Sequence, residues 1–300
     1  MGFRERPIRE ADQGHHLCLL FDEDAVRQKI IGTYLSAGLR RGEHLTYFAD
    51  RRSVPDVLAW LEEAGLPATA AADRGQLSVA TAQEGYLTAG RFDPDAGVEQ
   101  MHRRVRSALA AGFSGLRVSG EMSWALDATH GVELLEEYEA KVNAVFAGQR
   151  ASAICQYDTH RFPPERLDHL DHRHPGRVEL EPLHDSSSLR LVPAFRAGQP
   201  CLRVEGEIDV HTSHALAAAL QTLDRRPGDV WVDMSRLEFI DLAGMRTLAQ
   251  AADGLGQGRR LRVVELAPTL CEVIRVAGWD ADTSLTVSPP APSEATARRP

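Results

Sequence analysis

Short apolar runs alternate with segments of helical periodicity along the first half of the chain. The runs are almost continuously apolar, which is typical of parallel strands buried on both faces. They lie at residues 15–21, 44–49, 76–82, 115–120 and 151–157, and the helical segments lie at 24–39, 53–65, 95–112 and 130–148. The alternation predicts an α/β domain with a mostly parallel sheet and right-handed crossovers.

The pattern changes after residue 165. Residues 166–189 lose periodicity, mix His, Asp and Pro, and end near three serines, so we place a domain boundary within 175–188. The turn RAGQP then lies between two apolar runs and predicts a hairpin. The second half is expected to form a mixed sheet with helices. Its strands are predicted at 188–195, 201–208, 230–234 and 261–266, and its helices at 214–223, 242–256 and 269–279.

These patterns predict one domain at residues 10–180 and another at 188–287. The stretch 288–300 is rich in Pro, Ala and Ser and predicts a disordered tail.

Composition narrows the class of protein. With 34 Lys and Arg against 43 Asp and Glu, the net charge is −9, so we expect no direct binding to nucleic acid. No signal peptide pattern follows Met1, and no apolar run approaches the roughly 20 residues that span a bilayer. A cytoplasmic protein without a membrane segment is expected. Cysteines scattered in apolar runs suit buried thiols better than a disulfide frame or a zinc knuckle; they are Cys18, Cys155, Cys201 and Cys271.

The stretch FIDLAGMRTL, residues 239–248, combines an acid with small residues at the start of a helical pattern. Asp241 is placed to N-cap the following helix, an interaction worth about 1 kcal/mol. Ala243 and Gly244 would leave the first turn bare, so that the backbone of another protein can approach it. The alternative is a capped helix that packs on a sheet and has no further role.

Three stretches of the second domain together resemble a known family: GEID (206–209), VWVDMSRLEFIDLAGMRTLAQAA (230–252) and RLRVVELAPTLCEVIRVAGW (260–279). Over essentially all of 188–287 the chain resembles the STAS domain, the fold of bacterial anti-sigma factor antagonists. The resemblance implies binding to an anti-sigma factor or a related regulatory protein. The partner-binding residues expected from it are Asp209, Asp241, Leu242, Ala243, Gly244 and Arg246.

In this family the residue after the aspartate is usually a serine or threonine that an anti-sigma kinase phosphorylates. Here that position is Leu242, which has no hydroxyl and cannot carry the usual charge switch. Other hydroxyls have simpler roles: Thr212 or Ser213 as a helix cap, and Thr247 in the helix body. We expect neither these residues nor Ser235 to be phosphorylated.

Acidic residues close or follow every predicted strand of the first domain, and ligands usually bind at that edge of a parallel sheet. The first strand leads through FDEDAV rather than a glycine-rich phosphate loop, which disfavours ATP hydrolysis. An acidic and aromatic cleft is expected there, suited to a cation or a polar small molecule. Its predicted residues are Asp22, Asp50, Glu84, Glu121, Trp124, Tyr157 and Asp158, with Tyr86 nearby.

The stretches HHLCLLFDEDA, LSAGLRRGEHLTYFAD, LRVSGEMSWALD, LLEEYEAKVNAVF and AICQYDTHRFPPERL resemble the MEDS domain, a sensory module of methanogen and methylotroph regulators. The resemblance covers roughly residues 10–185 and implies a RecA-like layout without a phosphate loop, with a sensory input role. RecA-like enzymes keep a catalytic acid near the position of Glu121. The alternative for Glu121 is pairing with an arginine such as Arg117.

The histidines at 169, 172 and 174, in LDHLDHRHP, look like metal ligands but lack the spacing of a helical zinc site. We interpret His169, His172 and His174 as parts of a solvated linker. His15 and His16 most simply open a strand. No metal site and no cofactor are predicted.

The leading hypothesis is a two-domain regulator that has no catalytic residues, in which a sensory domain controls an anti-sigma factor antagonist-like domain. Two alternatives remain open. In one, the first domain is a ligand- or nucleotide-dependent enzyme that uses Glu121 and Asp158. In the other, the STAS-like domain is a scaffold within a larger signalling complex, which would include homo-oligomers.

Overall fold

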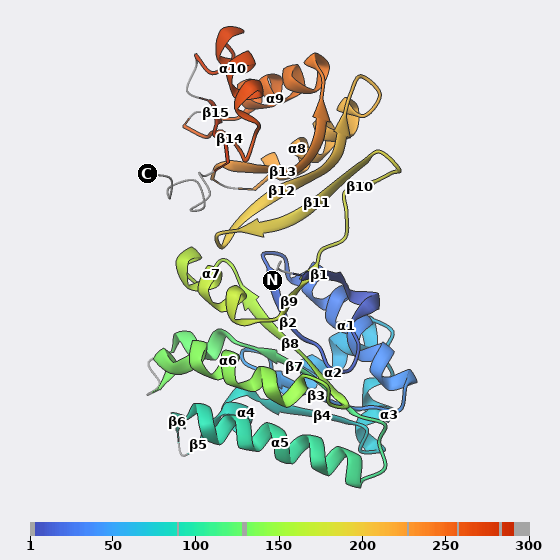
Figure 1. Ribbon diagram of the computed structural model, residues 1–300. Helices are drawn as coiled ribbons and strands as arrows, with labels where there is room; N and C mark the ends of the chain where they lie inside the picture. Colours follow the sequence, from blue (N-terminus) through green and yellow to red (C-terminus); the bar gives the residue numbers. More distant parts are fainter. Residues whose placement is uncertain are drawn as a thin grey trace. The chain divides into compact units, whose positions relative to one another are not determined.

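The computed structural model describes residues 4–88, 90–127, 131–226, 228–256, 258–281 and 284–290 (Figure 1). The chain divides into two compact units, Met1–Glu179 and Leu180–Pro300. Within the described ranges, none of the helices has the length and apolar character needed to cross a membrane.

The first unit is built on a seven-stranded sheet in which every neighbouring pair is parallel. The strand order is β1-β9-β2-β8-β7-β3-β4. The five predicted strands and the α/β class are confirmed, while β1 and β9 were missed. The strands are β1 (Arg4–Pro7), β2 (His16–Phe21), β3 (His44–Ala49), β4 (Leu77–Thr81), β7 (Leu116–Glu121), β8 (Ala151–Asp158) and β9 (Gly176–Glu179).

Helices cover both faces of this sheet, with α1 to α3 on one side and α5 to α7 on the other (Figure 1). Local signals start several of them. Ser53 caps α2, and the Asp93 carboxylate accepts from the first free N–H groups of α5. The helices are α1 (Asp24–Arg40), α2 (Val54–Glu63), α3 (Ala68–Asp73), α4 (Ala82–Tyr86), α5 (Pro94–Ala110), α6 (Leu135–Phe146) and α7 (Pro164–Arg173). Short elements complete the unit: η1 (Ile8–Glu10), η2 (Ser123–Leu126), η3 (Val132–Leu134) and the hairpin β5 (Leu87–Thr88) with β6 (Arg91–Phe92).

The interpretation of residues 166–189 as an aperiodic linker was wrong over its first half. Residues 164–173 form α7, and 176–179 form β9, which pairs with both β1 and β2. Leu167, Leu170 and Asp171 are buried, and the Asp171 carboxylate pairs with Arg177. His174 is 4% exposed, so it is not a solvated linker residue, whereas His169 and His172 face solvent.

The second unit is a six-stranded mixed sheet, as predicted, in the order β10-β11-β12-β13-β14-β15. Strands β11 and β12 form the predicted antiparallel hairpin, and the strands from β12 onward are parallel. At its turn, Ala197 and Gly198 both have positive φ, the geometry that matches the twist of a two-residue hairpin. The elements are β10 (His184–Asp185), β11 (Leu189–Arg196), β12 (Gln199–Ile208), α8 (Ser213–Asp224), β13 (Val230–Ile240), α9 (Leu242–Gly254), β14 (Leu261–Val264), α10 (Pro268–Val276) and β15 (Leu285–Val287).

Strand β13 is longer than predicted. It continues from Met234 to Ile240 because its second half pairs with β12 beyond an irregularity in the register. Its end therefore lies beside the end of β12, with Ile208 opposite Ile240. Ser288, in the predicted tail, still donates to Val263 and accepts from Leu266, and residues 291–300 lie outside the described residues.

Candidate functional site

The corner at the start of α9 is held by hydrogen bonds from one aspartate. The Asp241 Oδ1 accepts from the Gly244 N–H at 2.9 Å, and the Asp241 N–H donates to the Ile208 carbonyl at 2.9 Å. The first bond satisfies a helix N–H that would otherwise lack a partner, so the predicted N-cap is confirmed. The second ties the corner to the neighbouring strand. The backbone at the start of α9 is therefore fixed from two directions.

Large apolar side chains are exposed at this corner. Leu242 is 48% exposed, Phe239 is 52% exposed, and Val210 is 65% exposed. Phe239 lies at the end of β13, Val210 just beyond β12, and Leu242 opens α9. Single exposed apolar residues are common, but these three lie within two residues of the ends of two neighbouring strands. We call Val210, Phe239 and Leu242 the corner patch.

Gly244 faces the core and not the solvent. A Cβ atom at this position would lie 2.5 Å from Cγ2 of Ile208 and 2.8 Å from Cγ1 of Ile240. The glycine therefore lets α9 pack closely on its own sheet. The predicted role, leaving space for the backbone of a partner, does not explain this glycine. Ala243 is partly buried beside it, and Arg246 is exposed on the next turn.

Asp209 organises the adjacent loop. Its Oδ1 accepts from the backbone N–H groups of His211 at 2.8 Å and Thr212 at 2.9 Å, and from the Thr212 hydroxyl at 3.0 Å. Burial opposes ionisation, but these hydrogen bonds hold the pKa of Asp209 below its ordinary value. Thr212 occupies the N-cap position of α8 without a side-chain cap bond, because its hydroxyl accepts from the Asp209 N–H instead.

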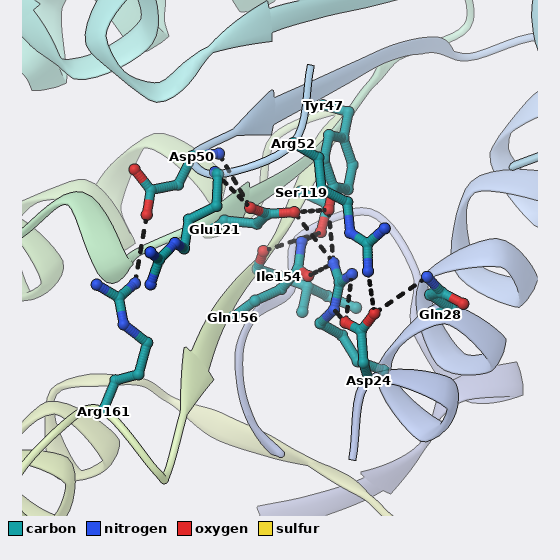
Figure 2. A network of polar contacts seen from close by, with 12 residues as sticks. Asp24, Gln28, Tyr47, Asp50, Arg52, Ser119, Glu121, Ile154, Gln156 and Arg161 are labelled. Carbon is teal, nitrogen blue, oxygen red and sulfur yellow. Dashed lines mark hydrogen bonds and ion pairs between the residues drawn. The ribbon is translucent and has the colours of Figure 1, made fainter. Parts of the chain in front are cut away.

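In the first unit, a pocket of about 260 Å³ lies at the carboxyl ends of the strands. Figure 2 shows the polar network beside it, which includes Glu121 and the ion pair of Asp50 with Arg161. The pocket is lined by Phe21, Asp24, Arg27, Arg51, Arg52, Glu121, Ser123, Gln156, Asp158 and Arg161.

Both oxygens of Glu121 are engaged (Figure 2). Oε1 accepts from the Tyr47 hydroxyl at 2.5 Å and from Arg27 at 3.1 Å, and Oε2 accepts from the Asp50 N–H at 2.9 Å. The arginine paired with Glu121 is thus Arg27. Arg117, which was predicted as a possible partner of Glu121, pairs with Glu43 instead.

The structure brings only some of the predicted ligand residues together. Glu121 and Asp158 line the pocket, and Asp50 borders it through an ion pair with Arg161 at 3.5 Å. Burial and the charge of Glu121 raise the pKa of Asp50. The other predicted residues are not part of the pocket lining: Asp22 follows Phe21 outside it, Glu84 caps α4 at the surface, Trp124 stacks on Tyr86 in the core, and the Tyr157 hydroxyl donates to Glu139.

The charge of the pocket differs from the acidic cleft that was predicted. Four arginines face three carboxylates in its lining: Arg27, Arg51, Arg52 and Arg161 against Asp24, Glu121 and Asp158. The prediction considered only the acids at the strand ends. The adjacent arginines at 51 and 52, directly after a strand, were the signal that it overlooked. An arginine-rich lining favours an anionic ligand over a cation.

Comparison with known proteins identifies the domains. Residues 15–175, more than half of the 300-residue chain, match the family model of the MEDS domain, described as the methanogen/methylotroph, DcmR sensory domain. The chain belongs to the MEDS family. After the MEDS domain, residues 193–287 match the family model described as the Mlab, STAS domain. The order of the two domains agrees with the resemblances seen in the sequence.

The STAS domain also has a curated relative. It is 29% identical over 94 residues to the anti-sigma-F factor antagonist RsfB of Mycobacterium tuberculosis, covering 31% of this chain and 77% of the relative. A crystal structure of an anti-sigma factor antagonist from Mycobacterium paratuberculosis is 26% identical, with a TM-score of 0.31, and covers 38% of this chain and 96% of its own.

One further solved structure is similar at lower identity. A KaiC-like protein, PH0186 of Pyrococcus horikoshii, is 13% identical with a TM-score of 0.44, and the match covers 65% of this chain and 85% of that protein. Together, the MEDS domain, the STAS domain and the antagonist relative indicate a regulatory protein.

Proposed function

We propose that the STAS domain binds an anti-sigma factor or a related regulatory protein through the corner patch, with Arg246 and Asp209 at its margin. The observation that carries the proposal is the exposure of Leu242 and Phe239 beside a helix start that Asp241 holds in place. Apolar side chains on a rigid backbone are the usual energetic centre of a protein interface. The antagonist name of the curated relative supports this class of partner.

Leu242 also bears on how such binding is controlled. It occupies the position that the resemblance assigns to the phosphoacceptor, and a leucine cannot accept a phosphate. Binding through the corner patch is then not switched by phosphorylation of that residue. Control is expected to come from the MEDS domain. The chain acts as a non-enzymatic regulator on this proposal.

The test is a capture experiment with the full chain and two matched variants. Leu242→Asp adds a charge within the corner patch, and Val276→Asp adds the same charge at an 80% exposed apolar position on α10. Burying an unpaired carboxylate disfavours an interface, and a penalty of about 1.4 kcal/mol or more weakens binding at least tenfold, so we expect the first variant to lose about 90% or more of the captured partner. Mass spectrometry identifies the partner, and calorimetry then measures its affinity.

Two results would contradict the proposal: a partner that binds wild type and Leu242→Asp equally, or one that Val276→Asp abolishes and Leu242→Asp does not. Size-exclusion chromatography of the same samples addresses the scaffold alternative. A scaffold would run as a large assembly that Leu242→Asp leaves intact.

We further propose that the MEDS domain senses a small anionic molecule in the pocket at the strand ends. The support is the excess of arginine in the lining and the buried Nη1 of Arg161, which makes no hydrogen bond among the described residues and reaches Asp50 only as an ion pair at 3.5 Å. A volume of about 260 Å³ suits a small metabolite. Short-chain carboxylates and inorganic phosphate are the probes for a thermal-shift screen. Binding should weaken at least about tenfold in Arg161→Ala and not in the exposed control Arg106→Ala.

The enzyme alternative places a catalytic acid at Glu121. Because Tyr47, Arg27 and Asp50 already donate to this carboxylate, it is better suited to holding strand ends together than to accepting a proton from a substrate. ATP hydrolysis by the purified chain that disappears in Glu121→Gln would favour the enzyme instead.

A further inference from the structure

Four potential metal ligands meet inside the MEDS domain, away from the pocket lining. His16 comes from β2, Cys155 from β8, Glu139 from α6, and His174 directly follows α7. Their exposed fractions are between 0% and 6%. One ligand atom from each side chain lies within 4.8 Å of the corresponding atoms of the other three. The elements that contribute them are far apart in the sequence and are brought together by the sheet and the helices that cover it.

Four of the six distances between the ligand atoms match the edges of a coordination tetrahedron, and the other two are at most 4.8 Å. His16 Nε2 lies 3.3 Å from Cys155 Sγ and 3.4 Å from Glu139 Oε2. Glu139 Oε2 lies 3.4 Å from His174 Nε2 and 3.6 Å from Cys155 Sγ. Zinc bonds of about 2.0–2.1 Å to nitrogen or oxygen and about 2.3 Å to sulfur give tetrahedral edges of about 3.3–3.6 Å.

The tautomer of His16 is set by its neighbours. The Asn143 side-chain amide donates from Nδ2 to the Arg173 carbonyl at 2.8 Å, which leaves its Oδ1 as the acceptor for His16. His16 Nδ1 lies 2.7 Å from that oxygen and therefore carries the proton. His16 Nε2 is then an unprotonated lone pair that faces Cys155 and Glu139.

His174 is arranged in the same way. Its Nδ1 lies 2.8 Å from the Leu170 carbonyl and donates to it, which directs Nε2 into the cluster. Nε2 is buried and has no hydrogen-bond partner within the described part of the chain. It faces Oε2 of Glu139 at 3.4 Å. Nε2 of both histidines and a carboxylate oxygen thus converge in a dry interior, where either a proton or a metal cation can link them.

Outer contacts orient these ligands as they do around known metal ions. Both histidines donate from Nδ1, the ring nitrogen that faces away from the cluster, to a carbonyl or amide oxygen. The Tyr157 hydroxyl donates to Glu139 Oε1 at 2.6 Å. The fourth corner, Cys155, would supply a thiolate. A thiolate and a carboxylate together balance the charge of one divalent ion.

We propose that His16, Glu139, Cys155 and His174 form a buried structural site for a divalent transition-metal ion, with zinc as the best fit. Two imidazoles, one thiolate and one carboxylate are a zinc ligand set, and four protein ligands leave no open position for catalysis. Binding displaces the Cys155 thiol proton, which passes to solvent. The ion would fasten α6 and the end of α7 to β2 and β8. This role is separate from the anion pocket.

Metal uptake by the untagged full chain tests the site. After removal of metal with a chelator, the protein is titrated with Zn²⁺ or Co²⁺ and analysed by mass spectrometry of the bound metal. We expect one equivalent of either ion per chain. Cobalt should add intense visible bands, typical of tetrahedral coordination, and an ultraviolet thiolate-to-cobalt band. Zinc should also raise the unfolding temperature of this domain.

Matched variants assign the ligands. Cys155→Ser should remove the ultraviolet band, and His174→Ala should weaken zinc binding about 100-fold or more. His169→Ala, which changes an exposed histidine on α7, should bind like wild type. Asn143→Ala, which keeps all four ligands but loses the orienting contact to His16 and the hydrogen bond to the Arg173 carbonyl, should weaken binding about 10- to 100-fold. It serves as the second measurement if His174→Ala does not fold, as judged by circular dichroism.

The proposal fails if the metal-free chain takes up less than a tenth of an equivalent of both ions, which would leave the cluster as a proton-linked ion pair. It also fails if cobalt binds without a thiolate band, or if His169→Ala reduces uptake as much as Cys155→Ser.

Discussion

At the scale of single residues, local interactions were predicted from the sequence and distant ones were not. The Asp241 cap was predicted because its acceptor and donor are three residues apart, so the sequence alone places them together. The pairing of Glu121 with Arg27 spans 94 residues, and nothing in the local pattern indicates it. Gly244 is an intermediate case. The sequence shows that a small residue stands at the start of the helix, but only the fold shows that the missing Cβ would point into the sheet.

Gly244→Ala should destabilise the STAS domain, although alanine is the better helix former. The added Cβ would overlap Ile208 and Ile240, and overpacking of this kind costs about 1–3 kcal/mol. Urea denaturation measures the loss. The control is Gly254→Ala at the other end of α9, where a Cβ has no neighbour within 4 Å. If both variants were equally stable, α9 would not pack as closely as described.

At the scale of elements, the strongest apolar patterns were predicted and the polar helix α7 was missed. Its buried positions are 167, 170 and 171, and His174 follows in register, which is the i, i+3, i+4, i+7 spacing of a helix face. Two of these four residues are polar, so a search for apolar periodicity overlooks them. The proposed metal site was missed for the same reason, because His16, Glu139 and His174 are polar residues at buried positions.

A buried ion pair joins β7 to the residue just before β3, and a hydrogen bond from the same arginine reaches α1. Arg117 and Glu43 are both 0% exposed, with Nε 2.5 Å from Oε2, and Arg117 also donates to the Tyr34 carbonyl. Glu43→Ala would leave a buried guanidinium without its carboxylate, so we expect a loss of about 3–5 kcal/mol. The surface control is Glu99→Ala, which removes exposed ion pairs and should change stability by less than about 1 kcal/mol. Chemical denaturation of both variants compares the two.

Glu205 connects three strands of the STAS domain and should make it sensitive to acid. Burial opposes ionisation, but Arg203, Arg236 and Arg190 hold the pKa of Glu205 below its ordinary value. Its stabilisation is therefore complete above a pH of about 4.3 and is lost as the pH falls further, through the folded-state pKa. Thermal unfolding against pH should show this loss in wild type and less of it in Glu205→Gln. The exposed control Glu272→Gln should keep the wild-type acid response.

At the scale of the whole molecule, the two units have separate hydrophobic cores, and the STAS core is formed entirely by residues from Leu189 onward. Substitutions in different cores that share no contacts have additive effects. We expect calorimetry to resolve two unfolding transitions, with Glu43→Ala lowering one and Gly244→Ala lowering the other. A single transition that both variants lower equally would mean that the units unfold together.

The order of strands in the MEDS sheet has a consequence for synthesis of the chain. β1 lies at the sheet edge and pairs with β9, which is some 170 residues later in the sequence. A ribosome that adds about 5–20 residues per second needs roughly 10–30 s to produce that partner. During this interval residues 4–7 have no strand to join, and the sheet is completed only when the last strand of the domain emerges. The first strand of the domain to be synthesised is therefore among the last to be paired.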